Sequence, residues 1–210
     1  MPSFHGARLA ILAAAALFST GGAAIKASSF TAWQVACLRS AIAAVALLLL
    51  VPAARRGWNW RMAGVAVAYA ATLVGFVTAS KLTTAANAIF LEDTAPLYLV
   101  LAGPLLLHER VRRVDLAVIA VMAVGLALFF AGGEGPTAIA PDPARGNLIG
   151  AGTGITWAIV IAGLRWVSRG NAGAGVATAV MGNLLAAAAT IWFAWPFAGA
   201  ARATDWLAPA

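Results

Sequence analysis

The chain has 210 residues, of which 62% are hydrophobic and only 10% are charged, and its mean hydropathy is +0.89. These values lie far outside the balance of a soluble globular domain and indicate an integral membrane protein, with the lipid bilayer as its surroundings. The net charge of +7 needs no nucleic-acid partner, because basic residues in the cytoplasmic loops of a polytopic protein give the same excess.

Apolar runs of about twenty residues recur along the chain and are separated by short polar stretches. Runs of this length predict an all-α polytopic membrane protein, a helical bundle of about seven transmembrane helices. We interpret the first run as a retained span and not as a cleaved signal peptide, because the charge pattern of the loops uses it as a span. The predicted spans are residues 8–25, 31–51, 62–80, 83–107, 116–131, 148–167 and 176–195.

The basic residues alternate between dense and sparse segments, and this alternation predicts the orientation in the membrane. With a cytoplasmic N-terminus, each inside loop between spans carries two or three basic residues and each outside loop carries one, in agreement with the positive-inside rule. The C-terminus then lies outside. The inside residues are Arg8, Arg55, Arg56, Arg61, Arg110, Arg112, Arg113, Arg165 and Arg169, and the outside ones are Lys26, Lys81, Arg145 and Arg202.

Two adjacent acids, Glu92 and Asp93, lie well inside the fourth predicted span. A carboxylate in hydrocarbon is costly unless it is paired, hydrated or protonated. Arg39, in the second span, lies at a similar depth, about 12 to 14 Å below the outer surface by helical rise, and is a candidate partner. A structural ion pair and a role in substrate binding or proton uptake are both open. Consecutive helical residues point about 100° apart, so one carboxylate can face Arg39 while the other faces a cavity.

Pro96 follows Glu92 by one helical turn in the same span. Its ring and missing N–H leave the carbonyl of Glu92 without its helical donor, which predicts a kink beside the acids. Such a kink either shapes a substrate cavity or only improves packing.

The longest connection, residues 132–147, is rich in glycine and proline and is typical of an external linker between two units. The first unit, residues 8–131, contains an odd number of spans, so the next unit begins on the opposite side of the membrane, as in inverted-repeat transporters. Residues 148–196 supply the first two helices of that incomplete second unit, and residues 197–210 form an external tail.

The second unit contains further candidates. Glycines that recur every four residues form a smooth ridge, which predicts close helix packing or a sliding surface for alternating access. Trp157, just past this ridge, is either a packed aromatic residue or a lining residue. When the ends of spans two and seven are aligned, Asn183 stands opposite Arg39, facing a partner helix or a cavity. The ridge glycines are Gly146, Gly150 and Gly154.

Short motifs fall at recurring places: Leu38-Arg39 in span two, Ala95-Pro96-Leu97 in span four, Leu107-His108-Glu109-Arg110 at its cytoplasmic end, and Gly125 in span five. In order and spacing they resemble the EamA family of the drug/metabolite transporter superfamily. The resemblance implies ten helices in two inverted units, export of metabolites, amino acids or drugs across the bacterial inner membrane, and a central cavity between the units. The sequence departs from this pattern in lacking the last three helices and in carrying Glu92-Asp93.

The sequence has no HExxH or GxSxG motif and no paired histidines, so we predict no enzyme activity, no catalytic residues, no metal and no other cofactor. We expect a multi-pass inner-membrane transporter, an exporter, of a small polar or amphipathic molecule. The alternative is a truncated or non-transporting membrane component that lacks half of the cavity. If the chain itself transports, a homo-oligomer would have to supply the missing wall. The predicted substrate-binding or coupling residues are Arg39, Glu92, Asp93, Trp157 and Asn183.

Overall fold

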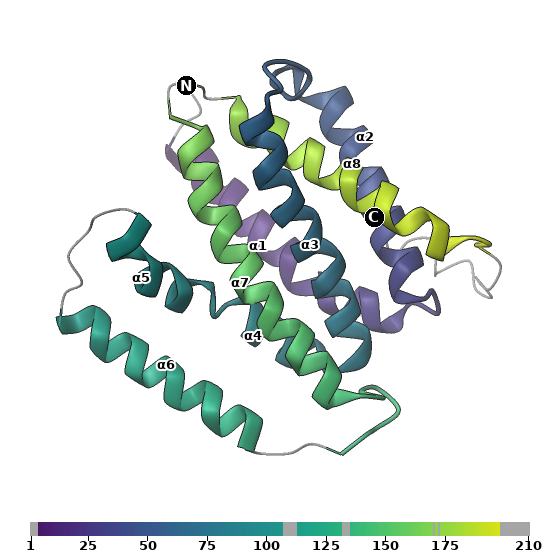
Figure 1. The fold of residues 1–210 in the computed structure, drawn as a ribbon. Coiled ribbons are helices and arrows are strands. Elements are labelled where there is room, and N and C mark those ends of the chain that lie inside the picture. Colours follow the sequence, from purple (N-terminus) through teal and green to yellow (C-terminus); the bar gives the residue numbers. More distant parts are fainter. Residues whose placement is uncertain (1–3, 107–112, 132–134, 170, 172, 198–210) are drawn as a thin grey trace.

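The computed structural model describes residues 4–106, 113–131, 135–169, 171 and 173–197, and its regular elements are helices (Figure 1). The all-α prediction is confirmed. The helices are α1 (Phe4–Ala27), α2 (Ala32–Leu50), the short 3-10 helix η1 (Pro52–Arg55), α3 (Trp60–Leu82), α4 (Ala85–Glu92), α5 (Ala95–Leu106), α6 (Arg113–Ala131), α7 (Pro143–Val167) and α8 (Ala174–Ala194).

Six segments of the described chain are long and apolar enough to cross a membrane, which confirms a polytopic helical membrane protein. The first predicted span corresponds to α1, which is outside this set. The motif residues 107–110 lie outside the described residues, as does the predicted tail beyond residue 197. The six segments are Ala32–Leu50, Trp60–Leu82, Ala85–Ala102, Val114–Ala131, Pro143–Val167 and Ala174–Ala194.

Two element boundaries differ from the expectation. The fourth predicted span is two helices, α4 and α5, and not one kinked helix. The helix α7 begins at Pro143, inside the stretch assigned to the linker, because Asp142 caps it. The carboxylate oxygen of Asp142 accepts a 3.1 Å hydrogen bond from the backbone N–H of Arg145. Hydropathy does not detect such a cap, since the first turn of the helix is polar.

The centre of the bundle consists of α2, α3, α7 and α8. The most extensive contacts are α3 with α7, α2 with α8, and α3 with α8, whereas α6 has minor contacts with α5. Close approach in the centre depends on glycine: a Cβ at Gly163 of α7 would lie 2.6 Å from Val65 of α3. In contrast, α6 buries no residue of its apolar window. The helices predicted for the second unit therefore pack directly against the first.

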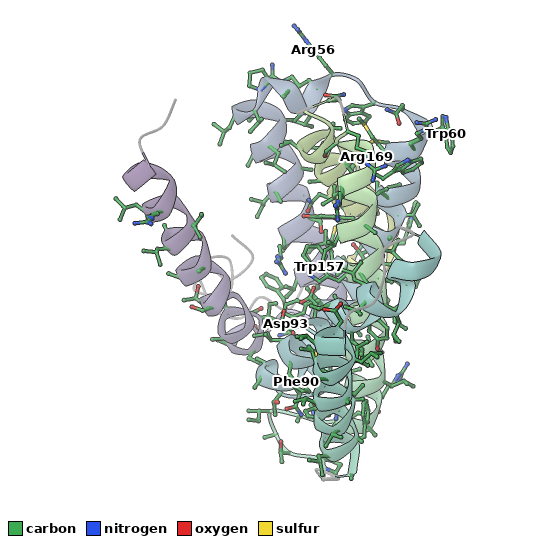
Figure 2. All side chains as sticks on the ribbon, turned by 90° about the vertical axis from the view of Figure 1, so that its left-hand side faces the viewer. Arg56, Trp60, Phe90, Asp93, Trp157 and Arg169 are labelled. Atoms are coloured by element: carbon green, nitrogen blue, oxygen red, sulfur yellow. The ribbon has the colours of Figure 1, made fainter. Side chains whose placement is uncertain are left out.

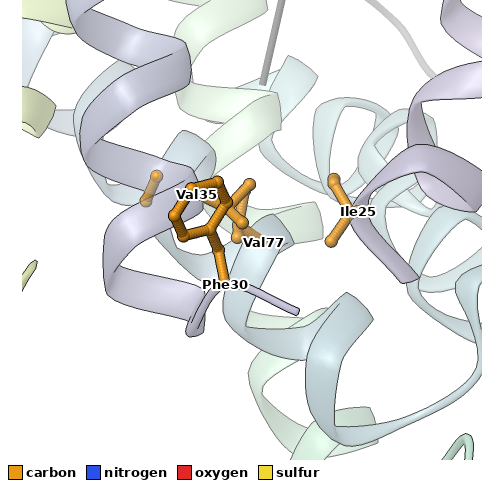
Figure 3. Close-up of a cluster of buried hydrophobic side chains, with 5 residues drawn as sticks. Ile25, Phe30, Val35 and Val77 are labelled. Atoms are coloured by element: carbon orange, nitrogen blue, oxygen red, sulfur yellow. The ribbon is translucent and has the colours of Figure 1, made fainter. Parts of the chain in front are cut away.

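A cluster of buried apolar side chains joins the end of α1 to α2 and α3 (Figure 3). Ile25, Phe30, Val35 and Val77 are each at most 2% exposed. Beside it, the ammonium of Lys81 donates a 2.6 Å hydrogen bond to the carbonyl of Ser28. These contacts join the end of α1 to α2 and α3 at the predicted outer end of the bundle.

Candidate functional site

The break between α4 and α5 lies at the acidic pair. Glu92 is the last residue of α4, and Asp93 follows it as the C-cap, its N–H donating a 2.9 Å hydrogen bond to the carbonyl of Ile89. The hydroxyl of Thr94 donates a 2.6 Å hydrogen bond to the carbonyl of Leu91, which satisfies one carbonyl at the end of the helix. These two bonds satisfy backbone groups inside an apolar bundle, where an irregular segment is otherwise costly.

Pro96 lies in the first turn of α5. In that turn a proline is tolerated, because the first N–H groups of a helix have no partner within the helix. The expected kink is thus a complete break, because α4 ends at Glu92 and α5 begins at Ala95, one residue before Pro96.

Arg39 of α2 and Glu92 interact electrostatically in the interior, and both side chains are partly buried. They do not form a direct ion pair: within the described part of the chain, no carboxylate oxygen lies within 4.0 Å of the Arg39 guanidinium. The sequence left open which acid faces Arg39. Glu92 interacts with it, while the adjacent Asp93 is exposed at the break and interacts with Glu92.

Tyr69 of α3 connects the predicted site residues, although the sequence analysis did not single it out. Its side chain interacts with that of Asn183 and, electrostatically, with Arg39. Its ring meets the indole of Trp157 edge to face, with centroids 6.5 Å apart and planes at 64°. The signal was in the sequence, because a tyrosine in mid-span lies away from the membrane surfaces that amphipathic rings prefer.

Close packing between α3 and α8 holds Tyr69 in place. A Cβ at Gly182 would lie 2.6 Å from Cδ1 of Tyr69, so only glycine allows the ring to lie this close to the backbone of α8. On α8, the buried Asn183 also donates a 2.9 Å hydrogen bond to the carbonyl of Ala179. Asn183 and Arg39, set opposite each other by the sequence alignment, therefore both interact with Tyr69.

The glycine ridge of α7 faces α4 and its two ends. A Cβ at Gly146 would lie 2.6 Å from the backbone nitrogen of Thr83, and one at Gly150 would lie 3.0 Å from Leu91. A Cβ at Gly154 would lie 2.5 Å from the hydroxyl oxygen of Thr94. The ridge thus packs α7 against the break between α4 and α5. Trp157 follows Gly154 by three residues. In Figure 2, Trp157 and Asp93 both lie at the middle height of the molecule.

Polar pairs between α7 and its neighbours were also missed. Thr72 of α3 and Thr156 of α7 have hydroxyl oxygens 2.7 Å apart, and the buried Thr83 donates a 2.7 Å hydrogen bond to the amide oxygen of Asn147. Threonine in an apolar run usually bonds its own helix, so these cross-helix bonds leave no sequence signal. They join the second unit to the first on either side of the site.

The arrangement can bind a polar ligand but offers little to a metal ion. Among the described residues, no group of three or more His, Cys, Asp or Glu side chains could hold a metal. A guanidinium, two carboxylates, a phenol, an amide and an indole converge from α2, α3, the break, α7 and α8. Ion pairing, hydrogen bonding and stacking on an aromatic ring are the interactions that this set supports.

Fold and site together define a polytopic α-helical membrane protein with ionisable groups inside its bundle. The chain belongs to the EamA-like transporter family, which matches residues 6–131. The match covers α1 to α6 and ends with the predicted first unit, so the resemblance drawn from the sequence is confirmed. The comparisons with curated proteins and with solved structures gave no match.

Proposed function

We propose that the chain is a multi-pass transporter of the inner membrane that exports a small polar or amphipathic metabolite, amino acid or drug by alternating access. Membership of the family and the six apolar segments support a membrane transporter. The more specific proposal, transport of a small polar or amphipathic molecule, is supported mainly by the interior pair of Arg39 and Glu92. Their charges interact without a direct ion pair in the described chain. Ionisable residues inside a membrane bundle mark substrate or ion pathways.

The proposed binding mode uses the separation of these two charges. An anionic group of the ligand is attracted to Arg39 and a cationic group to Glu92. Each side chain then gains an ion-pair partner that it does not have among the described residues. The rings of Tyr69 and Trp157, which meet edge to face with centroids 6.5 Å apart, offer apolar aromatic contacts to the rest of the ligand. Asn183 is proposed to bind through its amide.

The coupling of transport to proton uptake and release is assigned to Asp93. Its side chain is exposed at the break between α4 and α5, where it can exchange protons with water that reaches the site. Broken helices at mid-membrane are the usual place of substrate and ion sites in transporters with inverted repeats. The contacts of α7 and α8 with α2 and α3 supply the interface at which the two units would rock against each other.

The proposed orientation has the N-terminus in the cytoplasm. The α2–α3 and α7–α8 connections carry Arg55, Arg56 and Arg169, and they lie at one end of the molecule, as Figure 2 shows for Arg56 and Arg169. A concentration of arginine favours the cytoplasmic side.

Transport by the purified full chain in lipid vesicles tests the proposal. The probes are a radiolabelled neutral amino acid, a dicarboxylate and the cationic dye ethidium, each preloaded and measured by exchange. We expect exchange of at least one probe above that of empty vesicles, and a fall of about tenfold in Glu92→Gln and in Asp93→Asn, or ~1.4 kcal/mol.

Arg145→Gln is the matched control, because Arg145 is an exposed residue at the far end of α7. It should exchange the probe at the rate of the unaltered chain. The proposal is wrong if both acid variants retain the full rate and the same pH dependence.

A further inference from the structure

Arginine and tryptophan residues lie at the end of the molecule where α3 begins and α7 ends. The guanidinium carbon of Arg61 lies 5.6 Å from the ring centre of Trp60 and 5.2 Å from that of Trp166. Figure 2 shows Arg56, Trp60 and Arg169 at this same end of the molecule. We call these five residues the arginine–tryptophan cluster.

Contacts between two turns bring the cluster together from distant parts of the chain. A Cβ at Gly57 would lie 3.5 Å from the amide nitrogen of Asn171, and one at Gly173 would lie 3.2 Å from Cβ of Ala53. The α2–α3 turn therefore packs on the α7–α8 turn. Gly57 has a φ of 75°, a conformation that glycine adopts without strain, and it redirects the chain between Arg56 and Trp60.

The two indoles leave the hydrogen-bond donors of Arg61 available. An arginine that stacks on rings uses the faces of its guanidinium, whereas its N–H donors point outward in the guanidinium plane. Within the described residues, the Arg61 guanidinium has no ion pair and donates to no protein acceptor. Arg56, Arg61 and Arg169 are all exposed and have no ion pair in the described chain. The cluster is therefore positively charged, and its planar hydrogen-bond donors have no anionic partner among the described residues.

The surface that extends from the cluster toward mid-membrane is apolar. On α7, Ile155, Ile159 and Trp166 recur at helical spacing and are 48%, 52% and 44% exposed. On α3, Val67 follows Trp60 by seven residues on the same face and is also exposed. Basic groups at the membrane surface above an apolar face match a molecule that has an anionic head and hydrocarbon tails.

We propose that the arginine–tryptophan cluster binds the phosphate of an anionic phospholipid, such as phosphatidylglycerol, whose acyl chains lie along the exposed faces of α3 and α7. The guanidinium of Arg61 binds the phosphate oxygens, and Arg56 and Arg169 add charge. The two indoles lie at the headgroup level, where amphipathic rings are favoured, and basic residues there attract anionic lipids. The site joins the first unit to the second and does not depend on the transport proposal.

The test is lipid binding by the purified full chain in a neutral detergent. Short-chain phosphatidylglycerol, short-chain phosphatidylcholine and inorganic phosphate are titrated separately, and binding is followed by the shift in thermal unfolding and by calorimetry. We expect phosphatidylglycerol to bind more tightly than phosphatidylcholine, with an affinity that falls as salt rises. Removing one arginine should weaken phosphatidylglycerol binding about fivefold, since each basic residue near the surface contributes ~1 kcal/mol.

The variants separate this site from general surface charge. Arg61→Gln and Arg169→Gln should each weaken phosphatidylglycerol binding, whereas Arg145→Gln, at the other end of α7, should not. Arg61→Lys keeps the charge but loses the planar stack, and should bind with intermediate affinity. Circular dichroism verifies that each variant is folded.

Two outcomes would overturn the inference. The first is equal affinity for phosphatidylglycerol and phosphatidylcholine, or equal loss in Arg61→Gln and Arg145→Gln. The second is that inorganic phosphate binds as tightly as the lipid, which would assign the cluster to a soluble anion.

Discussion

The four central helices and α6 differ in packing although all are apolar. α3 and α7 meet through Gly75, Gly163 and polar pairs such as Thr72 with Thr156, whereas α6 buries none of its apolar window and has the highest hydropathy of the six candidate spans. Hydrocarbon tails are as apolar as leucine, so hydrophobicity places a helix in the bilayer without choosing its neighbour. Small residues and interhelical hydrogen bonds make that choice, and the candidate site lies where they are concentrated.

The largest effect is expected where a side chain would meet backbone. Gly146→Ala places a methyl group 2.6 Å from the backbone nitrogen of Thr83, and because that backbone cannot move without displacing α4, we expect the variant to lose about 2–3 kcal/mol of stability. The measurement is the unfolding midpoint in detergent, followed by circular dichroism.

Two glycines in open positions are the controls. Gly152, on α7 like Gly146, and Gly125, on α6, have no atom within 4 Å of an added Cβ. Alanine at either position should keep or slightly raise the midpoint, because alanine favours the helix over glycine by up to ~1 kcal/mol. If Gly125→Ala were as damaging as Gly146→Ala, the contrast between the centre and α6 would be wrong.

The next largest effect concerns the interior charges of the central bundle. Arg39→Gln and Glu92→Gln should each lower transport about tenfold, ~1.4 kcal/mol in the barrier, because each variant leaves one charge in the interior without the other. The double variant should lose less than the sum of the two single losses, since coupled residues are not additive. The transport rates of the unaltered chain, the two single variants and the double variant in vesicles give the coupling free energy between Arg39 and Glu92. If the losses of the two single variants simply add in the double variant, the two charges act separately.

The smallest effect is expected at Tyr69. Tyr69→Phe keeps the ring beside Gly182 and Trp157 but removes the hydroxyl that interacts with Asn183 and Arg39. The loss of one polar interaction of this kind costs ~1 kcal/mol, so the apparent affinity for the transported probe should fall about fivefold. Tyr98→Phe, which alters the other tyrosine of the chain, is the matched control for stability and uptake. Equal affinities in the two variants would remove Tyr69 from the site.

Several residues of the candidate site could be identified individually from the sequence. Charged groups inside apolar runs stand out because hydrocarbon penalises them, so Arg39, Glu92 and Asp93 could be selected without coordinates. Their mutual arrangement could not be selected. Helical rise predicts equal depth, but it does not show that Arg39 and Glu92 lack a direct ion pair, nor that Tyr69 interacts with both Arg39 and Asn183.

The amino-acid sequence alone indicates a chain that crosses a membrane several times as helices, because runs of about twenty apolar residues have no other stable state in hydrocarbon. Its motifs also led to the EamA family, which the match over residues 6–131 shows. The break of the fourth span at Asp93, the start of α7 at Pro143 and the place of α6 at the edge of the bundle became visible only in the folded chain. These features depend on caps and on contacts between distant helices, and neither changes the hydropathy of the chain.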